Sequence, residues 1–408
     1  MARQFPRLAA ALGLALLAPG LASARTVEVD STTALISAIK NAEPGDDIVL
    51  ADGTYPITGR GKIAANSQGT PDAPITVRAA HRWKAEIRSS AIVAFDVTGP
   101  NWTFKDLDIR GTCSNDTDCE HAFHVVGGAN NFRMIGNRIA DFNAHLKVNA
   151  VDRVIPTGGL VEANELFDTH PRQTGNPVVP LDIDHGGEWV VRGNYIYDFH
   201  KGAGNEVSYG AFVKGGGDRP IFERNVVVCR RHDETGGTRV GLSFGGGGME
   251  PANCAPNFNA NAPCEQTRGG IMRNNIIANC GDVGIYVNDA PNSLILFNTL
   301  IRTRGIDFRF AGATGEARGN LMASDIRTRD GGTFKDGGNM TRMRSGDLEA
   351  MYRDPDLADL RLKGPVTAIA GKGGSEPRVT NDFCGRKRTG AADMGALQSS
   401  LGDCPTLP

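Results

Sequence analysis

Short apolar strands recur along the chain, and many of them are followed by a phrase built around an asparagine. One copy reads Arg133-Met-Ile-Gly-Asn137-Arg-Ile, with apolar residues on both sides of the asparagine. The copies are centred on Asn137, Asn164, Asn194, Asn225, Asn275, Asn298 and Asn320. These asparagines are 27, 30, 31, 50, 23 and 22 residues apart. The shortest spacings fit one coil of a parallel β-helix, with three short strands per turn, and the longer ones carry loops.

The repeated asparagines are predicted to be structural. In a stacked solenoid their side-chain amides form a hydrogen-bonded ladder at a turn between strands. Residues 25–340 are predicted as one β-helix domain, and residues 341–408 as irregular coils and a tail of the same domain. Helical spacing of apolar residues over Thr32–Ala42 predicts a capping helix at the N-terminal end, which would otherwise expose strand edges.

A second set of strands, one per coil, alternates between apolar and polar positions, so its polar side chains are expected to point outward. The residues expected to point inward are Leu181, Ile183, Val213, Ile285, Val287, Ile306 and Phe308. The outer column nearest the turn is predicted to hold Asn149, Asp184, Lys214, Ser243, Asn288 and Arg309, and the column beside it Lys147, Asp182, Phe212, Tyr286 and Asp307. Because coils stack about 4.8 Å apart, these side chains form one polar stripe, suited to a chain-like polar ligand.

Glycine clusters flank this stripe at Gly215–Gly217 and Gly245–Gly248. They lack side chains, and we expect them to let a bulky ligand approach the backbone. The insertion Gly245–Gly269 is expected to close part of the groove and to restrict the length of the substrate.

Residues 1–24 are predicted to be a secretory signal peptide. Arg3 and Arg7 precede an apolar stretch, and Ala22-Ser23-Ala24 offers a cleavage site near Ala24. Removal of two arginines from a chain with 44 Lys+Arg and 46 Asp+Glu gives 42 − 46 = −4. This balance argues against a general nucleic-acid binder. No later stretch approaches the ~18 apolar residues of a membrane span. We expect an exported monomer, periplasmic or extracellular.

Eight cysteines in an exported chain predict disulfides that staple loops. The cysteines that bracket a polar loop or the tail are Cys113 with Cys119, Cys254 with Cys264, and Cys384 with Cys404. No pair has the spacing of zinc ligands. The sequence leaves the connectivity open.

The segment Pro44-Gly-Asp-Asp-Ile-Val-Leu-Ala-Asp-Gly-Thr-Tyr55 forms a first coil ahead of the asparagine repeat, which runs to about residue 325. Together they resemble the right-handed parallel β-helix polysaccharide lyases, nearest the chondroitinase B and alginate lyase family. The resemblance implies an all-β fold, a single-stranded right-handed parallel β-helix with an N-terminal capping helix. It also implies β-elimination from an acidic, uronate-containing polysaccharide.

In that family a lysine abstracts the proton at C5 of a uronic acid, an arginine assists, and a calcium ion held by Asn and Glu neutralises the carboxylate. Lys214 lies at the matching distance before a coil asparagine. The chain departs from the family at Val207 and Tyr209, which replace two glutamates, and the family's arginine falls near Ser243 or Phe244.

β-Elimination requires neutralisation of the uronate carboxylate, a base on one ring face and a proton donor for the leaving oxygen. Lys214 is the candidate base. Asp182 and Asp184 on one strand face, with Asn149 on the coil below, form a candidate oxygen site for Ca²⁺. Without a metal, Arg309 or Arg239 could grip the carboxylate in a bidentate manner.

Tyr286 or His185 could donate the proton, and Tyr286 could instead be a platform on which a sugar stacks. The remaining candidate substrate-binding residues are Lys147, Arg239, Ser243, Asn288 and Asp307.

Three other functions stay open. A uronate C5-epimerase would use the same proton abstraction and return a proton to the opposite face. A glycoside hydrolase would need Asp182 and Asp184 as acid and base. A non-catalytic glycan-binding or adhesion solenoid would need stacking aromatics, of which the stripe offers Phe212 and Tyr286.

Overall fold

A computed structural model describes residue 1 and residues 25–59, 62–246 and 248–405. The predicted signal peptide and its cleavage site therefore lie outside the described residues, apart from residue 1. Within the described chain, no helix is long and apolar enough to cross a membrane.

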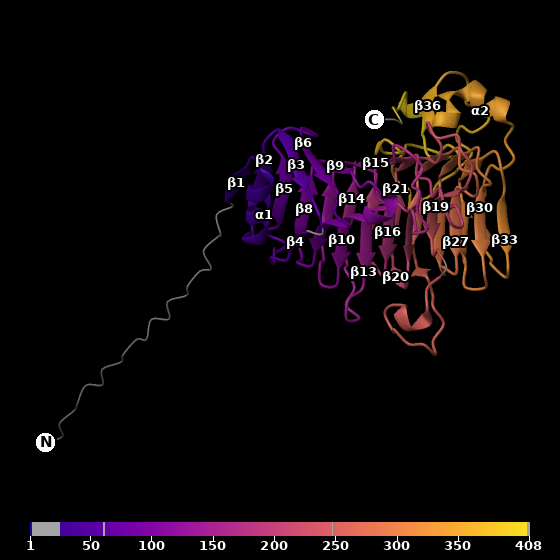
Figure 1. Ribbon diagram of the computed structural model, residues 1–408. Coiled ribbons are helices and arrows are strands. Elements are labelled where there is room, and N and C mark those ends of the chain that lie inside the picture. The colour runs from indigo at the N-terminus through magenta and orange to yellow at the C-terminus, as the bar shows by residue number, and fades with distance from the viewer. Residues whose placement is uncertain (2–24, 60–61, 247, 406–408) are drawn as a thin grey trace.

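Three long parallel sheets wind around one elongated core and form a right-handed parallel β-helix (Figure 1). Sheet A contains Thr26–Val29 (β1), Asp47–Leu50 (β2), Ile75–Ala79 (β5), Trp102–Lys105 (β8), Arg133–Ile135 (β11), Leu160–Glu162 (β14), Val190–Arg192 (β17), Ile221–Glu223 (β21), Ile271–Arg273 (β25), Ser293–Leu296 (β28), Gly315–Arg318 (β31) and Lys335–Asp336 (β34). Sheet B contains Gly53–Ile57 (β3), Ala85–Ser89 (β6), Asp108–Gly111 (β9), Arg138–Ala140 (β12), Glu165–Phe167 (β15), Tyr195–Tyr197 (β18), Val226–Val228 (β22), Ile276–Ala278 (β26), Thr299–Ile301 (β29) and Leu321–Met322 (β32).

Sheet C completes each coil and carries the outer face with the alternating polar positions. It contains Ile63–Ala65 (β4), Val93–Val97 (β7), His121–Val126 (β10), Ala144–Asn149 (β13), Leu181–Asp184 (β16), Val207–Lys214 (β19), Thr238–Phe244 (β23), Ile285–Asn288 (β27), Ile306–Arg309 (β30) and Ile326–Arg329 (β33). Two short pairs lie outside these sheets, Gly217–Asp218 (β20) with Thr267–Arg268 (β24) and Tyr352–Asp354 (β35) with Asp359–Leu362 (β36). The predicted fold class is confirmed.

Helix α1, Thr32–Lys40, covers the first coil at the N-terminal end, as predicted. The Ser31 hydroxyl accepts a hydrogen bond from the Ala34 amide at 3.3 Å and caps the helix. Leu35 and Ile39 are buried and belong to the same core as the sheets. The helix therefore removes the first coil's apolar edge from water.

The asparagine ladder is present at the turn between sheets A and B. Each side-chain amide donates to the Oδ1 of the next asparagine at 2.8 to 3.1 Å, from Asn137 through Asn320. The ladder extends one step further than predicted, because Asn320 donates to Asn339. Asn225 and Asn275 are bonded at 2.9 Å although 50 residues separate them. The insertion between them therefore leaves the stacking of the coils unchanged.

All eight cysteines form disulfides. The pairs are Cys113–Cys119, Cys229–Cys280, Cys254–Cys264 and Cys384–Cys404. Three of these disulfides join cysteines that the sequence places on the two sides of one loop or of the tail. The fourth, Cys229–Cys280, joins two coils across the long insertion.

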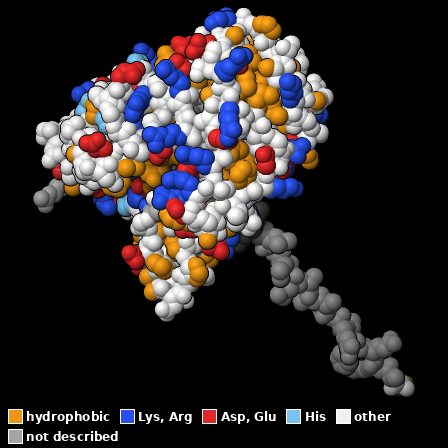
Figure 2. Space-filling view, turned by 90° about the vertical axis from the view of Figure 1, so that its right-hand side faces the viewer, with side chains coloured by type: hydrophobic (Ala, Val, Ile, Leu, Met, Phe, Trp, Pro, Cys, Tyr) orange, Lys and Arg blue, Asp and Glu red, His pale blue; other side chains and the backbone are white. Residues whose placement is uncertain are grey.

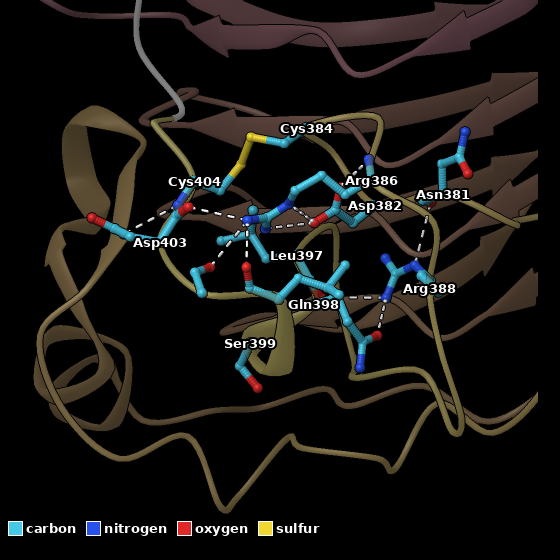
Figure 3. A network of polar contacts seen from close by, with 12 residues as sticks. Asn381, Asp382, Cys384, Arg386, Arg388, Leu397, Gln398, Ser399, Asp403 and Cys404 are labelled. Atoms are coloured by element: carbon cyan, nitrogen blue, oxygen red, sulfur yellow. Dashed lines mark hydrogen bonds and ion pairs between the residues drawn. A yellow bond between two sulfur atoms is a disulfide. The ribbon is translucent and has the colours of Figure 1, made fainter.

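Residues 341–405 return along sheet B and cover part of its outer face (Figure 1). They form helix α2, Ser345–Met351, and the pair β35–β36, whose apolar side chains pack on Tyr195, Val226 and Ile276. Figure 3 shows the polar contacts that fasten the end of this segment, in which Arg386 binds Asp382 at 2.7 Å. Arg388 donates to the carbonyls of the same segment, and burial lowers its pKa to about 10.

The C-terminal end of the solenoid carries Lys and Arg side chains with hydrophobic side chains between them (Figure 2). In sheet C this end is strand β33, where Arg327 and Arg329 are exposed and both bind Asp307 at 2.7 Å. Charged side chains on an edge strand disfavour pairing with another strand.

Candidate functional site on sheet C

The register of sheet C shows which side chains share its outer face. The residues predicted to point inward are fully buried, and so are Val97, Val125, Val148 and Phe244 in the same row. Lys147 pairs with Asp182, which pairs with Phe212, and Asp184 pairs with Lys214. We call these two outward columns, from β7 to β30, the polar stripe.

The predicted register is wrong at Ser243. Ser243 pairs with Phe212 and Tyr286, so it belongs to the second column and not beside Lys214. It is fully buried and donates to the carbonyls of Tyr286 and Gly245. The position above Lys214 is therefore Gly245, which has no side chain to mark the column in the sequence.

A cluster of two lysines and two aspartates lies in the middle of the polar stripe. We call Asp182 and Asp184 the acidic pair. Lys147 Nζ lies 2.9 Å from Asp182 Oδ1 and 3.5 Å from Asp184 Oδ2. Lys214 Nζ lies 3.9 Å from Asp184 Oδ2 and 4.9 Å from the centre of the Phe212 ring. Each lysine side chain is 16% exposed, so both can be reached from outside.

Two opposing effects act on the Lys147 ammonium. Burial disfavours its charge, but the carboxylates of the acidic pair more than offset this cost, so its pKa is raised. Lys147 is therefore charged at neutral pH. The sequence predicted it as a substrate-binding residue, and the structure places its ammonium between two carboxylates.

Asp96, His121 and His124 extend the polar stripe toward the N-terminus and were not predicted from the sequence as site residues. His124 Nδ1 lies 3.5 Å from Asp96 Oδ1, and its Nε2 lies 3.2 Å from Asn149 Oδ1. The hydrogen bond from His124 and the ammonium of Lys62 lower the pKa of Asp96 although burial opposes them. Burial, with the nearby charges of His124 and Lys147, lowers the pKa of His121 to about 4. The sequence contains the information needed to place His124 on the polar stripe, because His124 aligns with Lys147 once the strands are set in register.

His185 lies at the turn after β16, with a positive φ of 69°. Its Nε2 contacts the carbonyl of Asn253, and its ring lies 6.1 Å from that of Phe258. Its Nδ1 is buried, lacks a hydrogen-bond partner and lies 3.5 Å from Asp184 Oδ1, which also lacks one. The insertion thus covers His185, the predicted proton donor, and the ring of this histidine faces the acidic pair.

Tyr286, Asn288, Asp307 and Arg309 lie further along the stripe. Arg309 donates to the Tyr286 hydroxyl at 3.2 Å and binds Asp330 at 2.5 Å. Asp307 is fully buried beneath its two arginine partners. Arg309 is three coils from Lys214, or about 14 Å at the usual coil spacing. The structure therefore does not bring Arg309 to the same sugar unit as Lys214.

Contrary to the prediction, the structure does not place Arg239 where it could grip a substrate carboxylate. Arg239 is fully buried near the start of β23, where it binds Asp233 at 2.7 Å and donates to the carbonyls of Cys229 and Thr235 at 3.0 Å. Burial lowers its pKa, although Asp233 opposes that shift. The loop that precedes the strand folds back over the guanidinium and supplies these oxygens.

The insertion Gly245–Gly269 projects from the turns that follow sheet C (Figure 1). It is fastened to the turn after β19, because Ala255 donates to the Gly215 carbonyl and Gly216 donates to the Gln266 carbonyl, both at 2.8 Å. Gly216 has a φ of 88°, and a Cβ there would lie 1.8 Å from the Ala255 carbonyl oxygen. This glycine is therefore required for contact with the insertion. That a ligand approaches the backbone at the glycine clusters stays a prediction.

The acidic pair does not offer an open calcium site in this arrangement. Calcium takes six to eight oxygen ligands, about 2.3 to 2.6 Å away. Here the Lys147 ammonium lies between the two carboxylates, and Asn149 is turned toward His124. Among the described residues, no group of three or more His, Cys, Asp or Glu side chains is placed to hold a metal ion.

The stacked sheets and the ionisable side chains on one outer face define a right-handed parallel β-helix protein with a candidate site on sheet C. The family model of chondroitinase B matches residues 29–188, which include Lys147 and the acidic pair but end before Lys214. Pectate lyase Pel9A has a similar structure, with a TM-score of 0.60 and 15% identity over 92% of this chain and 97% of that chain. A rhamnogalacturonan lyase gives a TM-score of 0.51 and 15% identity over 92% of this chain and 97% of that chain.

A search of curated proteins finds no match to the chain. The matched region and the shared fold confirm the resemblance to parallel β-helix polysaccharide lyases.

Proposed function

We propose that the protein is an exported polysaccharide lyase that cleaves an acidic, uronate-containing glycan by β-elimination, with Lys214 as the base. The observation that carries this proposal is the placement of Lys214, partly exposed on the outer face of sheet C and bound to Asp184 beside a second ammonium. Export is supported by the four disulfides, which persist in oxidising compartments.

The reaction breaks the C5–H bond and the C4–O bond of the uronate and forms a C4=C5 double bond. The Lys214 ammonium first releases a proton to solvent, and the neutral amine then takes the C5 proton. If the leaving oxygen lies on the same ring face, the ammonium formed on Lys214 is the acid that protonates it. A second cation, Lys147, contacts the same Asp184 carboxylate, and we assign it to neutralise the uronate carboxylate.

Tyr286 and Arg309 fit a second role, because they lie two and three coils beyond the strand of Lys214. The Tyr286 ring offers a surface for a sugar, and Arg309 a charged group for another uronate of the same chain. A polysaccharide lying along the polar stripe would contact both. In this proposal they bind substrate and do not carry out the proton transfer.

The test is the ultraviolet absorbance of the unsaturated product, followed over a panel of uronate polysaccharides with calcium chloride or with EDTA. We expect a rise with at least one substrate and a loss of at least about 100-fold in Lys214→Ala. The matched control is Lys105→Ala, which removes an exposed lysine from sheet A. A Lys214→Ala variant as active as the wild-type protein would rule out the assigned base.

A flat trace on every substrate would leave the epimerase, the hydrolase and the binding protein. Exchange of the C5 proton with heavy water then separates the epimerase from the other two. The hydrolase is less favoured, because both of its required carboxylates are held by the same lysine.

A further inference from the structure

Lys147 takes the central position in the acidic pair. Its ammonium contacts one oxygen of Asp182 at 2.9 Å and one oxygen of Asp184 at 3.5 Å. Both aspartates are more than nine-tenths buried, so their charges depend on a cation supplied by the protein or bound from solution. A lysine of the neighbouring coil supplies it.

The coils on both sides of the pair offer few further oxygen ligands. On one side, Lys147 and Asn149 are the neighbours, and Asn149 is engaged with His124. On the other side, the neighbours are the Phe212 ring and the second ammonium, that of Lys214. Two ammonium groups balance two carboxylates, so a divalent ion added to this cluster would leave it with excess positive charge.

We propose that Lys147 is the resident cation of the acidic pair and that the protein binds no calcium there. The ammonium attracts both carboxylates, offsets the repulsion between them and provides the positive charge that calcium would otherwise bring. The consequence for activity rests on the proposed function: the elimination proceeds in the presence of EDTA.

The proposal also says what happens when the lysine is removed. Lys147→Ala leaves two buried carboxylates with one ammonium, that of Lys214, at 3.9 Å from one of them. Two close carboxylates without their cation form an oxygen-rich site of net negative charge. The variant should therefore gain an affinity for calcium that the wild-type protein lacks.

The experiment measures thermal unfolding of the mature protein in calcium chloride, magnesium chloride or EDTA. We expect the melting temperature of the wild-type protein to be the same in calcium and in EDTA, and that of Lys147→Ala to rise by about 2 °C or more with calcium. The double variant Lys147→Ala/Asp182→Asn should lose this rise, and Lys105→Ala should behave as the wild-type protein. Lys147→Met, which keeps the aliphatic stem, carries the same test if Lys147→Ala does not fold.

Activity provides a second readout. Wild-type activity should be equal in calcium and EDTA, whereas the activity of Lys147→Ala should be low in EDTA and rise several-fold with calcium. A wild-type protein whose melting temperature rises with calcium, through a response that Asp182→Asn removes, would overturn the proposal. So would Lys147 variants that fold but do not respond to calcium. A protein without lyase activity would leave the thermal test intact, so the two failures are distinguishable.

Discussion

Lys214 Nζ lies 3.9 Å from Asp184 Oδ2, and the two residues are partners across β16 and β19. They lie on neighbouring coils, and the pairing of strands β16 and β19 places their side chains next to each other. Such a pair can be a simple ion pair or a base held by its counter-ion, and one substitution separates these roles.

Lys214→Arg keeps the positive charge and the ion pair with Asp184 but places a guanidinium that does not lose its proton in proteins. We expect activity to fall at least about 100-fold, as in Lys214→Ala, while the melting temperature stays close to that of the wild-type protein. Initial rates of product absorbance and thermal unfolding check both expectations. Retention of more than a tenth of the activity would assign Lys214 an ion-pair role.

His121 makes the stability of the protein depend on pH. Its pKa in the folded protein is about 4, because burial disfavours the charged ring, whereas an unfolded histidine titrates near 6.5. Below about pH 6.5 the unfolded chain binds a proton that the folded protein does not, so this residue reduces stability as the pH falls toward 4. Between pH 7 and pH 4.5 the cost is about 2 kcal/mol.

His121→Gln should remove this contribution, so its free energy of unfolding should fall less steeply on acidification than that of the wild-type protein. Urea unfolding at pH 7 and pH 4.5 gives the comparison. Equal losses in the two proteins would show that His121 is not the group responsible.

The asparagine ladder should be most sensitive in its middle. Asn275 Oδ1 accepts from both the backbone amide and the side chain of Asn225, at 3.1 and 2.9 Å, inside the protein. Asn275→Ala leaves these buried donors without a partner and should cost about 2 to 4 kcal/mol of unfolding free energy. Asn339→Ala, at the partly exposed end of the ladder, should cost about 1 kcal/mol. Equal costs measured by denaturant unfolding would contradict this difference.

The insertion is predicted to limit substrate length. Replacement of residues 250–264 by a short Gly-Ser linker removes the contacts with His185 and Gly215 and should broaden the range of product sizes. Chromatography of the products against time measures this. Unchanged product sizes in a variant that is folded and active would show that the insertion does not border the bound chain.

The fold and most of the stripe were predictable because two strong periodicities carry them. The asparagine repeat fixes one position in each coil, and strict alternation in strands such as Leu181–Asp184 separates the core from the outer face. Ser243 was placed in the wrong column because the position beside Lys214 is a glycine, which leaves no side chain to read. Arg239 was wrongly expected to bind substrate because a charged residue suggests exposure, whereas here a loop brings carbonyls to it.

The partners within the site were not predictable. The sequence places Lys147 and Asp182 in the same column, but it does not say that the ammonium turns into the acidic pair and not outward. That choice depends on side-chain rotamers and on burial. His121 and His124 were missed because their strand was not followed into the same columns.

The bond between Asn225 and Asn275 has a consequence for how this molecule can change. A segment of 50 residues was accommodated between two consecutive rungs, and the rungs kept the same separation as those joined by 22. Length added at this turn therefore leaves the hydrogen bond between consecutive rungs intact. Loops at the turns can therefore change in length and sequence while the strands that carry Lys214 and Asp184 keep their register.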